Sequence, residues 1–506
     1  MHRRRVLWNV AASFGSQLAG IAISLIIPRL LIEHYGSQVN GFVSTVARIA
    51  AYFAVVQGGV VAAAGAHLFR AFARDDTDAV RAIYVAAHRF FLRSGAVLAL
   101  AAAAFCFVYP LDFRGTDFYW QAVAMAAMAF VSIVAGYLVF FKYNLIVDSD
   151  QKSYIIINSV IVTNLLVAGI QVALITSNAP IVAVMAVVPV AELLRLFLTR
   201  AWVLRRYPYL SLDGPADTAA LSQKWDSLAI TTSRLLKFVL PSVIASVMLG
   251  FEYASVFLIY ATVFSVGSSI VEMASTTLAA TLGRIVAGGD QERVRRSYEV
   301  ASLVGVAAAA GLSVCFGVLF PSFLDLYLGS VADMSYWAPV LMWTFIANEF
   351  FTNIRLAPNL LVRATGHLRQ TRASAVIELV LACVITPLGV LWLGLDGLML
   401  GSLVSSLYRT LFLEWYCRVR LGMGGATLMV RRVAAMIVAG ALVGWALVGW
   451  ALAAVPGGPG ALAWTLRALV VAAATGAVLA ATAFLVDRAS LRALASFLRP
   501  GARAAS

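Results

Sequence analysis

Seven of the 38 Lys and Arg residues lie inside long apolar stretches of the chain, where a charge is costly unless it has a partner. On insertion scales, a basic residue at the centre of a membrane helix costs about 2.5–3.5 kcal/mol. Three of the seven, Arg29, Arg195 and Arg409, lie close enough to the end of a stretch for the side chain to reach water. The four deep ones are Arg48, Arg234, Lys237 and Arg355. We predict that these four bind a phosphate-bearing anionic substrate, because guanidinium and ammonium groups bind phosphate oxygens.

A polar stripe surrounds one of these cations. Its members recur at helical spacing, with Pro358 beside them: Asn348, Thr352, Arg355 and Asn359. Side chains at such a spacing share one face of a helix, so this face is expected to line a cavity or to contact another helix. In the first case the stripe binds substrate. In the second, Arg355 pairs with a glutamate such as Glu349 or Glu378, and the stripe is a seam between helices.

Two glutamates in apolar stretches, Glu272 and Glu349, are candidates for coupling transport to an ion. Glu272 is flanked by hydroxyl side chains, namely Ser265, Ser268, Ser269, Ser275 and Thr276. A carboxylate buried in such a groove could carry a proton or help to bind sodium. The alternative is that Glu272 pairs with the cations of the 227–250 stretch. Glu192 and Arg195, three residues apart, are expected to form a structural ion pair.

The composition places most of the chain in a lipid bilayer. Of its 506 residues, 62% are hydrophobic and 12% are charged, and the mean hydropathy is +0.89. Soluble proteins carry about 25% charged residues, so a soluble enzyme, a secreted disulfide scaffold and a nucleic-acid binder are excluded. The four cysteines lie in apolar stretches without CxxC spacing, and the five histidines are scattered. We therefore expect no metal site and no cofactor, apart from a coupling proton or sodium ion.

Fourteen apolar stretches are long enough to cross a bilayer, which predicts an all-α polytopic membrane protein. Their cores are 8–31, 41–66, 94–110, 118–141, 154–176, 180–199, 227–250, 254–282, 298–320, 336–361, 374–394, 398–416, 433–455 and 461–486. Alternate connections carry 29 of the 38 basic residues, whereas the other side carries only Arg114 and Arg467. By the positive-inside rule, both termini are predicted to be cytoplasmic. Most of the formal charge of +14 therefore reflects topology rather than a ligand.

The chain repeats itself with an offset of 214 residues. Asp78-Ala-Val-Arg-Ala-Ile-Tyr84 and Glu292-Arg-Val-Arg-Arg-Ser-Tyr298 each precede the third helix of a half. An even number of helices separates them, so we predict two six-helix lobes in parallel orientation. The predicted organisation is an N-terminal lobe at 1–199, a basic cytoplasmic linker at 200–226, a C-terminal lobe at 227–420, and two further helices with a tail at 421–506.

Three segments carry a resemblance to a known family. They are Ile27-Pro-Arg-Leu-Leu-Ile-Glu-His-Tyr-Gly-Ser-Gln-Val-Asn-Gly-Phe42, Leu360-Leu-Val-Arg-Ala-Thr-Gly-His-Leu-Arg369, and Gly394-Leu-Asp-Gly397 with Gly401. Their order along the chain resembles polysaccharide repeat-unit flippases of the multidrug/oligosaccharidyl-lipid/polysaccharide exporter superfamily. The resemblance implies alternating-access export of undecaprenyl-diphosphate-linked oligosaccharide across a bacterial inner membrane, for surface polysaccharide such as O-antigen or exopolysaccharide. It also implies membrane lipid and the polysaccharide polymerase and export machinery as partners of a monomeric carrier.

Other functions compete with this interpretation. A peptidoglycan-precursor flippase handles the same lipid diphosphate and also has fourteen helices. An ion-coupled multidrug exporter of the same superfamily would present carboxylates and aromatic rings to a cation, against which the deep basic residues argue. An enzyme is not expected, because Asp148-Ser149-Asp150 resembles a glycosyltransferase motif but lies in a short connection, and no nucleotide-binding or zinc motif is present.

Overall fold

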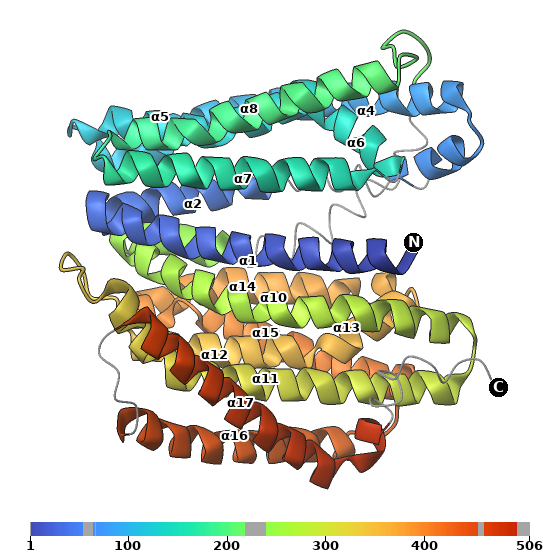
Figure 1. Cartoon of the computed structure of the whole chain (residues 1–506), viewed down its shortest axis with the longest axis vertical. Coiled ribbons are helices and arrows are strands. Elements are labelled where there is room, and N and C mark those ends of the chain that lie inside the picture. The colour runs from blue at the N-terminus through green and yellow to red at the C-terminus, as the bar shows by residue number, and fades with distance from the viewer. Residues whose placement is uncertain are drawn as a thin grey trace. The chain divides into compact units, whose positions relative to one another are not determined.

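The computed structural model describes residues 2–53, 64–65, 67–150, 152–217, 239–453 and 460–492 (Figure 1). Within these residues it contains helices and turns and no strand, which confirms the all-α prediction. The α-helices are α1 His2–Tyr35, α2 Ser37–Phe53, α4 Thr77–Val108, α5 Phe118–Ala135, α6 Phe141–Ser149, α7 Ser153–Thr176, α8 Ile181–Arg206, α10 Phe251–Ala287, α11 Gln291–Leu328, α12 Pro339–Ile354, α13 Leu356–Ala364, α14 Leu368–Leu393, α15 Leu400–Trp415, α16 Thr427–Ala453 and α17 Ala461–Val486. Short 3₁₀ or π segments extend them at η1 Tyr109–Phe113, η2 Gly136–Phe140, η4 Gly394–Gly397 and η5 Tyr416–Arg420.

The helices coincide with the predicted membrane segments. In the described part of the chain, nine helices are long and apolar enough to span a membrane. The remaining predicted segments fall on α1, on the shorter helices α2, α12 and α15, and on the helical segment Val239–Met248. The chain is thus a multi-pass membrane protein with two six-helix lobes and a C-terminal pair, α16 and α17.

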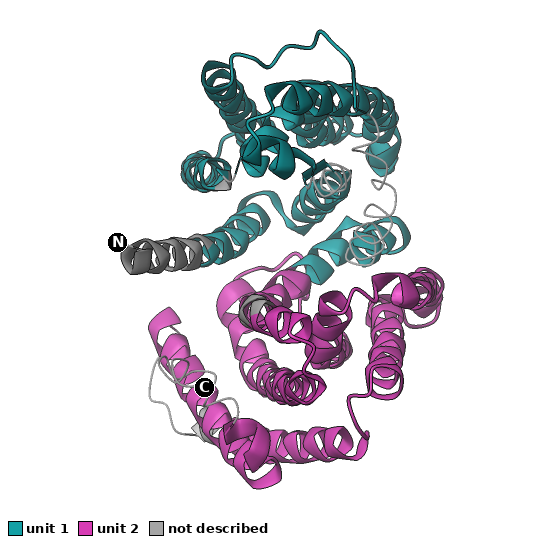
Figure 2. Ribbon diagram, turned by 90° about the vertical axis from the view of Figure 1, so that its right-hand side faces the viewer, with its two compact units in different colours: residues 1–258 teal, residues 259–506 magenta. Residues whose placement is uncertain are grey.

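The chain forms two compact units, Met1–Leu258 and Ile259–Ser506 (Figure 2). In the first unit, α1 packs on α2 and α7, and α5 packs on α2, α4 and α8. In the second, α11 contacts α12, α13, α16 and α17, while α15 contacts α12 and α14. The predicted lobe and linker boundaries stay a prediction.

The 214-residue repeat is visible in the backbone. Gly36 and Gly250 both have positive φ, 86° and 105°, directly before α2 and α10. Asp76 and Asp290 both accept hydrogen bonds from backbone N–H groups at the starts of α4 and α11. Because such a cap satisfies donors that have no partner within the helix, the two long helices begin at equivalent residues for the same physical reason.

Both units interrupt a helix at equivalent places. In the first unit, α5 passes through the π segment η2 into α6, which begins at Phe141. In the second unit, α12 ends at Ile354 and α13 begins at Leu356, with Arg355 between them. Pro358 has no N–H for the carbonyl four residues earlier, so the predicted continuous helix 336–361 is divided there.

The glycine-rich motif after α14 has a packing role. Gly394 adopts a positive φ of 58°, and a Cβ at Gly397 would collide with the backbone of Gly389. A Cβ at Gly401 would collide with Thr386 in the same way. The motif therefore allows α14 and α15 to approach closely after a tight turn.

Candidate functional site

The first unit contains a cavity of about 580 Å³ between α1, α2, α5, α6, α7 and α8. Most of its lining is apolar, and its polar lining residues are Ser44, Ser132, Asn144, Gln171, Glu192 and Arg195. Cavities of roughly 300–1,000 Å³ are typical of small-ligand sites. The mainly apolar wall suits an apolar group with a few polar substituents.

The two charged residues in this cavity neutralise each other. Arg195 Nη2 lies 2.5 Å from Glu192 Oε2, with the side chains 12% and 23% exposed. This confirms the predicted ion pair three residues apart on α8. The wall of the cavity therefore presents a dipole rather than a net charge.

Arg48 lies on α2 in the first unit and is half-buried. Its neighbours Ser44, Ala47 and Ala51 line the 580 Å³ cavity, whereas Arg48 itself is not among the lining residues. Two of the other three deep cations, Arg234 and Lys237, lie outside the described residues. Their predicted substrate-binding role, and their pairing with Glu272, stay predictions.

In the second unit, part of the predicted polar stripe is a seam between helices. The Ser406 hydroxyl on α15 donates to Asn348 Oδ1 over 2.8 Å, and Ser268 on α10 donates to a carboxylate oxygen of Glu349. Asn348 is buried, 9% exposed. These bonds hold α12 against α10 and α15, and they place the Glu349 carboxylate among hydroxyl and amide groups.

Arg355 occupies the break between α12 and α13 and faces α14. Its Nη1 lies 2.8 Å from Glu378 Oε1, and its Nη2 donates to the Thr352 hydroxyl over 3.4 Å. Arg409 on α15 approaches the other carboxylate oxygen of Glu378 at 3.8 Å and also donates to the Thr371 carbonyl. Of the two glutamates considered from sequence, Glu378 is thus the partner. Two guanidinium groups share one carboxylate, so these three residues carry a net positive charge.

The remaining predicted site residues are more scattered. Asn359 is half-buried on α13, and Glu272 is exposed on α10. The hydroxyls of Ser265 and Ser269 bond to carbonyls of α10 itself rather than to Glu272. The structure therefore brings Thr352 and Arg355 together and joins Asn348 to Glu349, and among the described residues no hydrogen bond or ion pair joins Glu272 to either pair.

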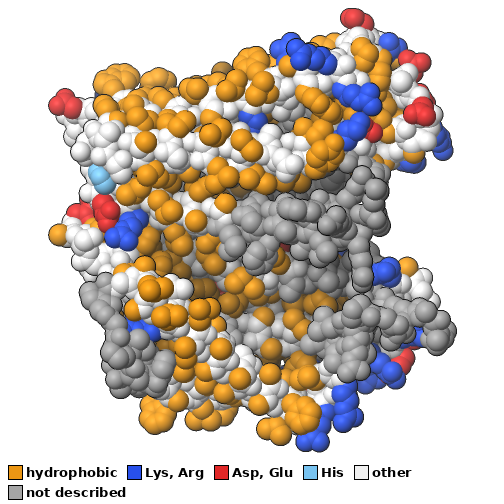
Figure 3. All heavy atoms as spheres, in the orientation of Figure 1, with side chains coloured by type: hydrophobic (Ala, Val, Ile, Leu, Met, Phe, Trp, Pro, Cys, Tyr) orange, Lys and Arg blue, Asp and Glu red, His pale blue; other side chains and the backbone are white. Residues whose placement is uncertain are grey.

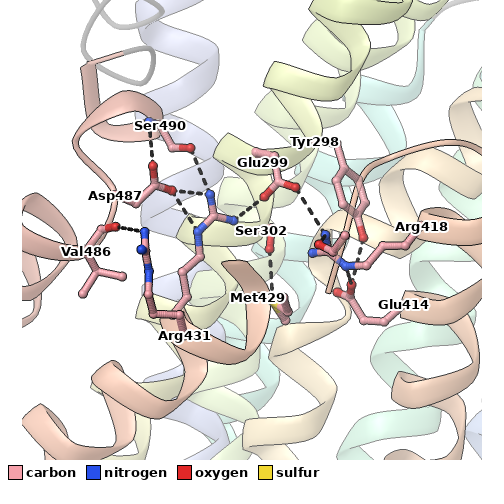
Figure 4. Close-up of polar contacts among 12 residues, drawn as sticks. Tyr298, Glu299, Ser302, Glu414, Arg418, Met429, Arg431, Val486, Asp487 and Ser490 are labelled. Atoms are coloured by element: carbon pink, nitrogen blue, oxygen red, sulfur yellow. Dashed lines mark hydrogen bonds and ion pairs between the residues drawn. The ribbon is translucent and has the colours of Figure 1, made fainter. Parts of the chain in front are cut away.

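Sequence reasoning missed a buried ionic network at one end of the second unit (Figure 4). Arg432 on α16 is fully buried and pairs with Glu299 of α11 at 2.5 Å and with Asp487 at the end of α17. Arg418 bridges Glu299 and Glu414, at 3.3 and 3.0 Å, and Tyr298 donates to Glu414 over 3.0 Å. In the sequence, Arg418 and Arg432 count among the 29 basic residues of alternate connections that indicate topology, and no local pattern distinguishes them from the exposed Arg431.

The network lowers the pKa of Asp487, which follows the last residue of α17. Burial opposes ionisation of this carboxyl, but hydrogen bonds from Ser490 and the charge of Arg432 outweigh it. Asp487 is therefore ionised and fixes the end of α17 to α16.

The repeated halves, the interrupted helices and the C-terminal pair define a helical membrane protein whose fold can be compared with those of known proteins. No protein-family model and no curated protein matches the sequence. Similar solved structures include the lipid II flippase MurJ in an inward closed conformation, at 10% identity and a TM-score of 0.71, covering 95% of this chain and 99% of that one. A multidrug resistance MATE family transporter of the MOP superfamily, in its inward-facing conformation, is similar at 14% identity and a TM-score of 0.62, covering 79% of this chain and 94% of that one. The eukaryotic MATE transporter AtDTX14 is similar at 13% identity and a TM-score of 0.53, covering 84% and 98% of the two chains. These structures are of transporters and a flippase, not enzymes, and the predicted superfamily resemblance is confirmed at the level of fold.

Proposed function

We propose that this protein is a flippase that moves an undecaprenyl-diphosphate-linked oligosaccharide from the inner to the outer leaflet of a bacterial inner membrane by alternating access. It acts as a monomer with both termini in the cytoplasm, and it supplies the polymerase and export machinery of a surface polysaccharide pathway. Glu349, held among polar groups, and Glu272 are the candidate carriers of a coupling proton or sodium ion.

The observation that carries this proposal is the C-terminal helix pair. Similarity to the lipid II flippase extends over 95% of this chain, whereas similarity to the inward-facing multidrug transporter covers 79%. In this chain α16 and α17 pack on α11 and are tied to it by the buried Arg432 network. A helix pair fixed in this way could support the long hydrocarbon tail of a lipid-linked substrate.

The charges of the described residues favour an anionic head group. Arg48 is half-buried in the first unit, and Arg355 and Arg409 exceed the single carboxylate of Glu378 in the second. The Arg355 Nε–H group is buried and has no acceptor among the described residues. A diphosphate could accept this hydrogen bond, because charge-assisted bonds to phosphate are among the stronger ones in proteins.

The direct test is flipping of a lipid diphosphate in vesicles that contain the purified protein. Replacing Arg234 and Lys237 together with glutamine is expected to abolish transport while leaving the protein at normal abundance. The matched control replaces Arg205 and Arg206, which are exposed at the end of α8, and should retain transport. Normal transport by the Arg234→Gln, Lys237→Gln variant would contradict the cation prediction.

A second set of variants separates substrate binding from structure at Arg355. Arg355→Gln should lower transport, and adding Glu378→Gln should not restore it if the guanidinium contacts substrate. If Arg355 acts only as a partner of Glu378, Arg355→Gln alone should retain transport, because Arg409 remains beside the Glu378 carboxylate. Thermal stability, measured in parallel, identifies variants that fail only by unfolding.

The multidrug transporters with the same fold provide a second candidate function. Their structural similarity and the Glu192–Arg195 pair in the 580 Å³ cavity favour it. Export of a lipophilic cation, with no flipping of a lipid diphosphate, would establish this alternative. Flipping of the peptidoglycan precursor in preference to other lipid-linked sugars would instead establish the lipid II function.

A further inference from the structure

Lys142 is a buried lysine in the first unit, at a position where the second unit has an apolar residue. It lies in the first turn of α6 and is 6% exposed. The residue 214 positions later, at the start of α13, is Leu356, a buried member of the apolar core of the second unit. A leucine thus fills the equivalent place in the other half, so packing alone does not account for an ammonium group here.

The groups around Lys142 are neutral or positive. Its Nζ lies 3.1 Å from His88 Nδ1 and 5.7 and 5.3 Å from the ring centres of Tyr84 and Tyr143. Arg200 on α8 adds a further positive charge, and among the described residues neither Lys142 nor Arg200 forms an ion pair with a carboxylate. An uncompensated buried ammonium costs several kcal/mol. An anion bound beside Lys142 would therefore stabilise this cluster.

The hydrogen bond to His88 also defines its tautomer. A protonated lysine can only donate, so Nδ1 of His88 accepts and the proton of the neutral ring is on Nε2. The Nε2–H group is then a donor for a further acceptor. Lys142, Arg200 and His88 together offer ammonium, guanidinium and imidazole donors from α6, α8 and α4.

The cluster belongs to the basic end of this unit. Lys and Arg side chains gather at one end of its helices, where α4 begins and α8 ends (Figure 3). Arg89 next to His88 is exposed, and Arg200 is half-buried, so this end of the unit presents cations to solvent in addition to the buried Lys142. Such an arrangement attracts anions toward a buried positive group.

We propose that Lys142, Arg200 and His88 form a phosphate-binding site separate from the cavity and from the Arg355 seam. The ligand is a phosphate monoester or diester group, either the head group of an anionic lipid or soluble phosphate. Three donor groups from three helices match the several acceptor oxygens of a phosphate, and the bound anion supplies the missing countercharge. This proposal does not depend on the transport function.

The test measures thermal unfolding of the full-length protein in an uncharged detergent. Inorganic phosphate is expected to raise the unfolding temperature beyond chloride at equal ionic strength, because a ligand that binds the folded state stabilises it. Lys142→Met should be more stable without phosphate and should bind phosphate at least about tenfold more weakly. The control Arg205→Gln, in the exposed last turn of α8, should respond as wild type does.

A second arm identifies the source of the phosphate. The same proteins are placed in nanodiscs of phosphatidylcholine with or without phosphatidylglycerol. Stabilisation by phosphatidylglycerol alone, lost in Lys142→Met and reduced in Arg200→Gln, assigns the site to a lipid head group, whereas stabilisation by inorganic phosphate assigns it to a soluble anion. If wild type and both variants respond equally to each probe, or wild type responds to neither, the site does not exist and Lys142 is a neutral core amine.

Discussion

Tyr84 in the first unit and Tyr298 in the second occupy the same position of the 214-residue repeat, but different charges surround them. Tyr298 donates to Glu414, and the guanidinium of Arg418 lies over its ring at 5.6 Å. Tyr84 has Lys142 beside its ring, and position 200, which is 214 residues before Glu414, is an arginine. The cluster around Tyr298 contains a carboxylate, that of Glu414. At the equivalent positions around Tyr84, the charged residues are Lys142 and Arg200, which are both basic.

The comparison shows that the two halves of the repeat share backbone features but differ in the charges of their side chains. Both halves of the 214-residue repeat keep the aspartate caps at residues 76 and 290 and the left-handed turns before α2 and α10, because the backbone requires them. Side chains beyond the caps are under no such requirement. In the second unit the charges bind α16 and α17 to α11, whereas Lys142 and Arg200 of the first unit have no carboxylate partner in the described part of the chain.

Of the substitutions that test this comparison, removal of Arg432 should change the stability of the protein most. Arg432→Met leaves Glu299 and Asp487 buried without their shared cation, which should cost about 3–5 kcal/mol of unfolding free energy. The measurement is the thermal unfolding temperature in detergent, with Arg431→Met as the control, since Arg431 is exposed and donates to the backbone carbonyl of Val486. Equal stability of the two variants would mean that the network does not anchor the C-terminal pair.

Adding a carboxylate to the first unit should make it resemble the second. Arg200→Glu places an acid at the position equivalent to Glu414 and gives Lys142 a partner. We expect a gain of about 1 kcal/mol in stability and the loss of phosphate-induced stabilisation. Arg205→Glu, one turn later and exposed, is the control. A destabilised Arg200→Glu protein that still responds to phosphate would refute the electrostatic distinction between the units.

The smallest expected effect is a dependence on pH. The pKa of Asp487 is below the ordinary aspartate value, so ionised Asp487 stabilises the fold above about pH 4, and this contribution is lost as the pH falls through its folded pKa. Wild type should therefore lose more stability than Asp487→Asn when the pH is lowered from about 5 to 3. Parallel curves for the two proteins would show that Asp487 does not contribute through its charge.

The fourteen segments and the repeat could be read from sequence because lipid imposes a simple rule. Every membrane segment must bury its backbone in a helix and present apolar side chains, so runs of hydrophobic residues report helices directly. The Glu192–Arg195 pair was equally accessible, since both residues lie on one helix. The division of α12 from α13 was missed, because a proline can bend a helix or end it, and neighbouring helices decide which.

Contacts between segments far apart in the chain could not be predicted from the sequence. Arg355 had two candidate partners, Glu349 and Glu378, and the packing of α13 against α14 selected Glu378. Arg432 and Arg431 are adjacent and chemically identical, yet one is fully buried and the other exposed. The bilayer acts on each segment alone, so the sequence by itself determined the helices, their number and the two-fold repeat. Which charges meet depends on how helices far apart in the chain pack, and only the tertiary structure decided that Arg432 is satisfied by Glu299 and Asp487 while Lys142 has no acid beside it in the described residues.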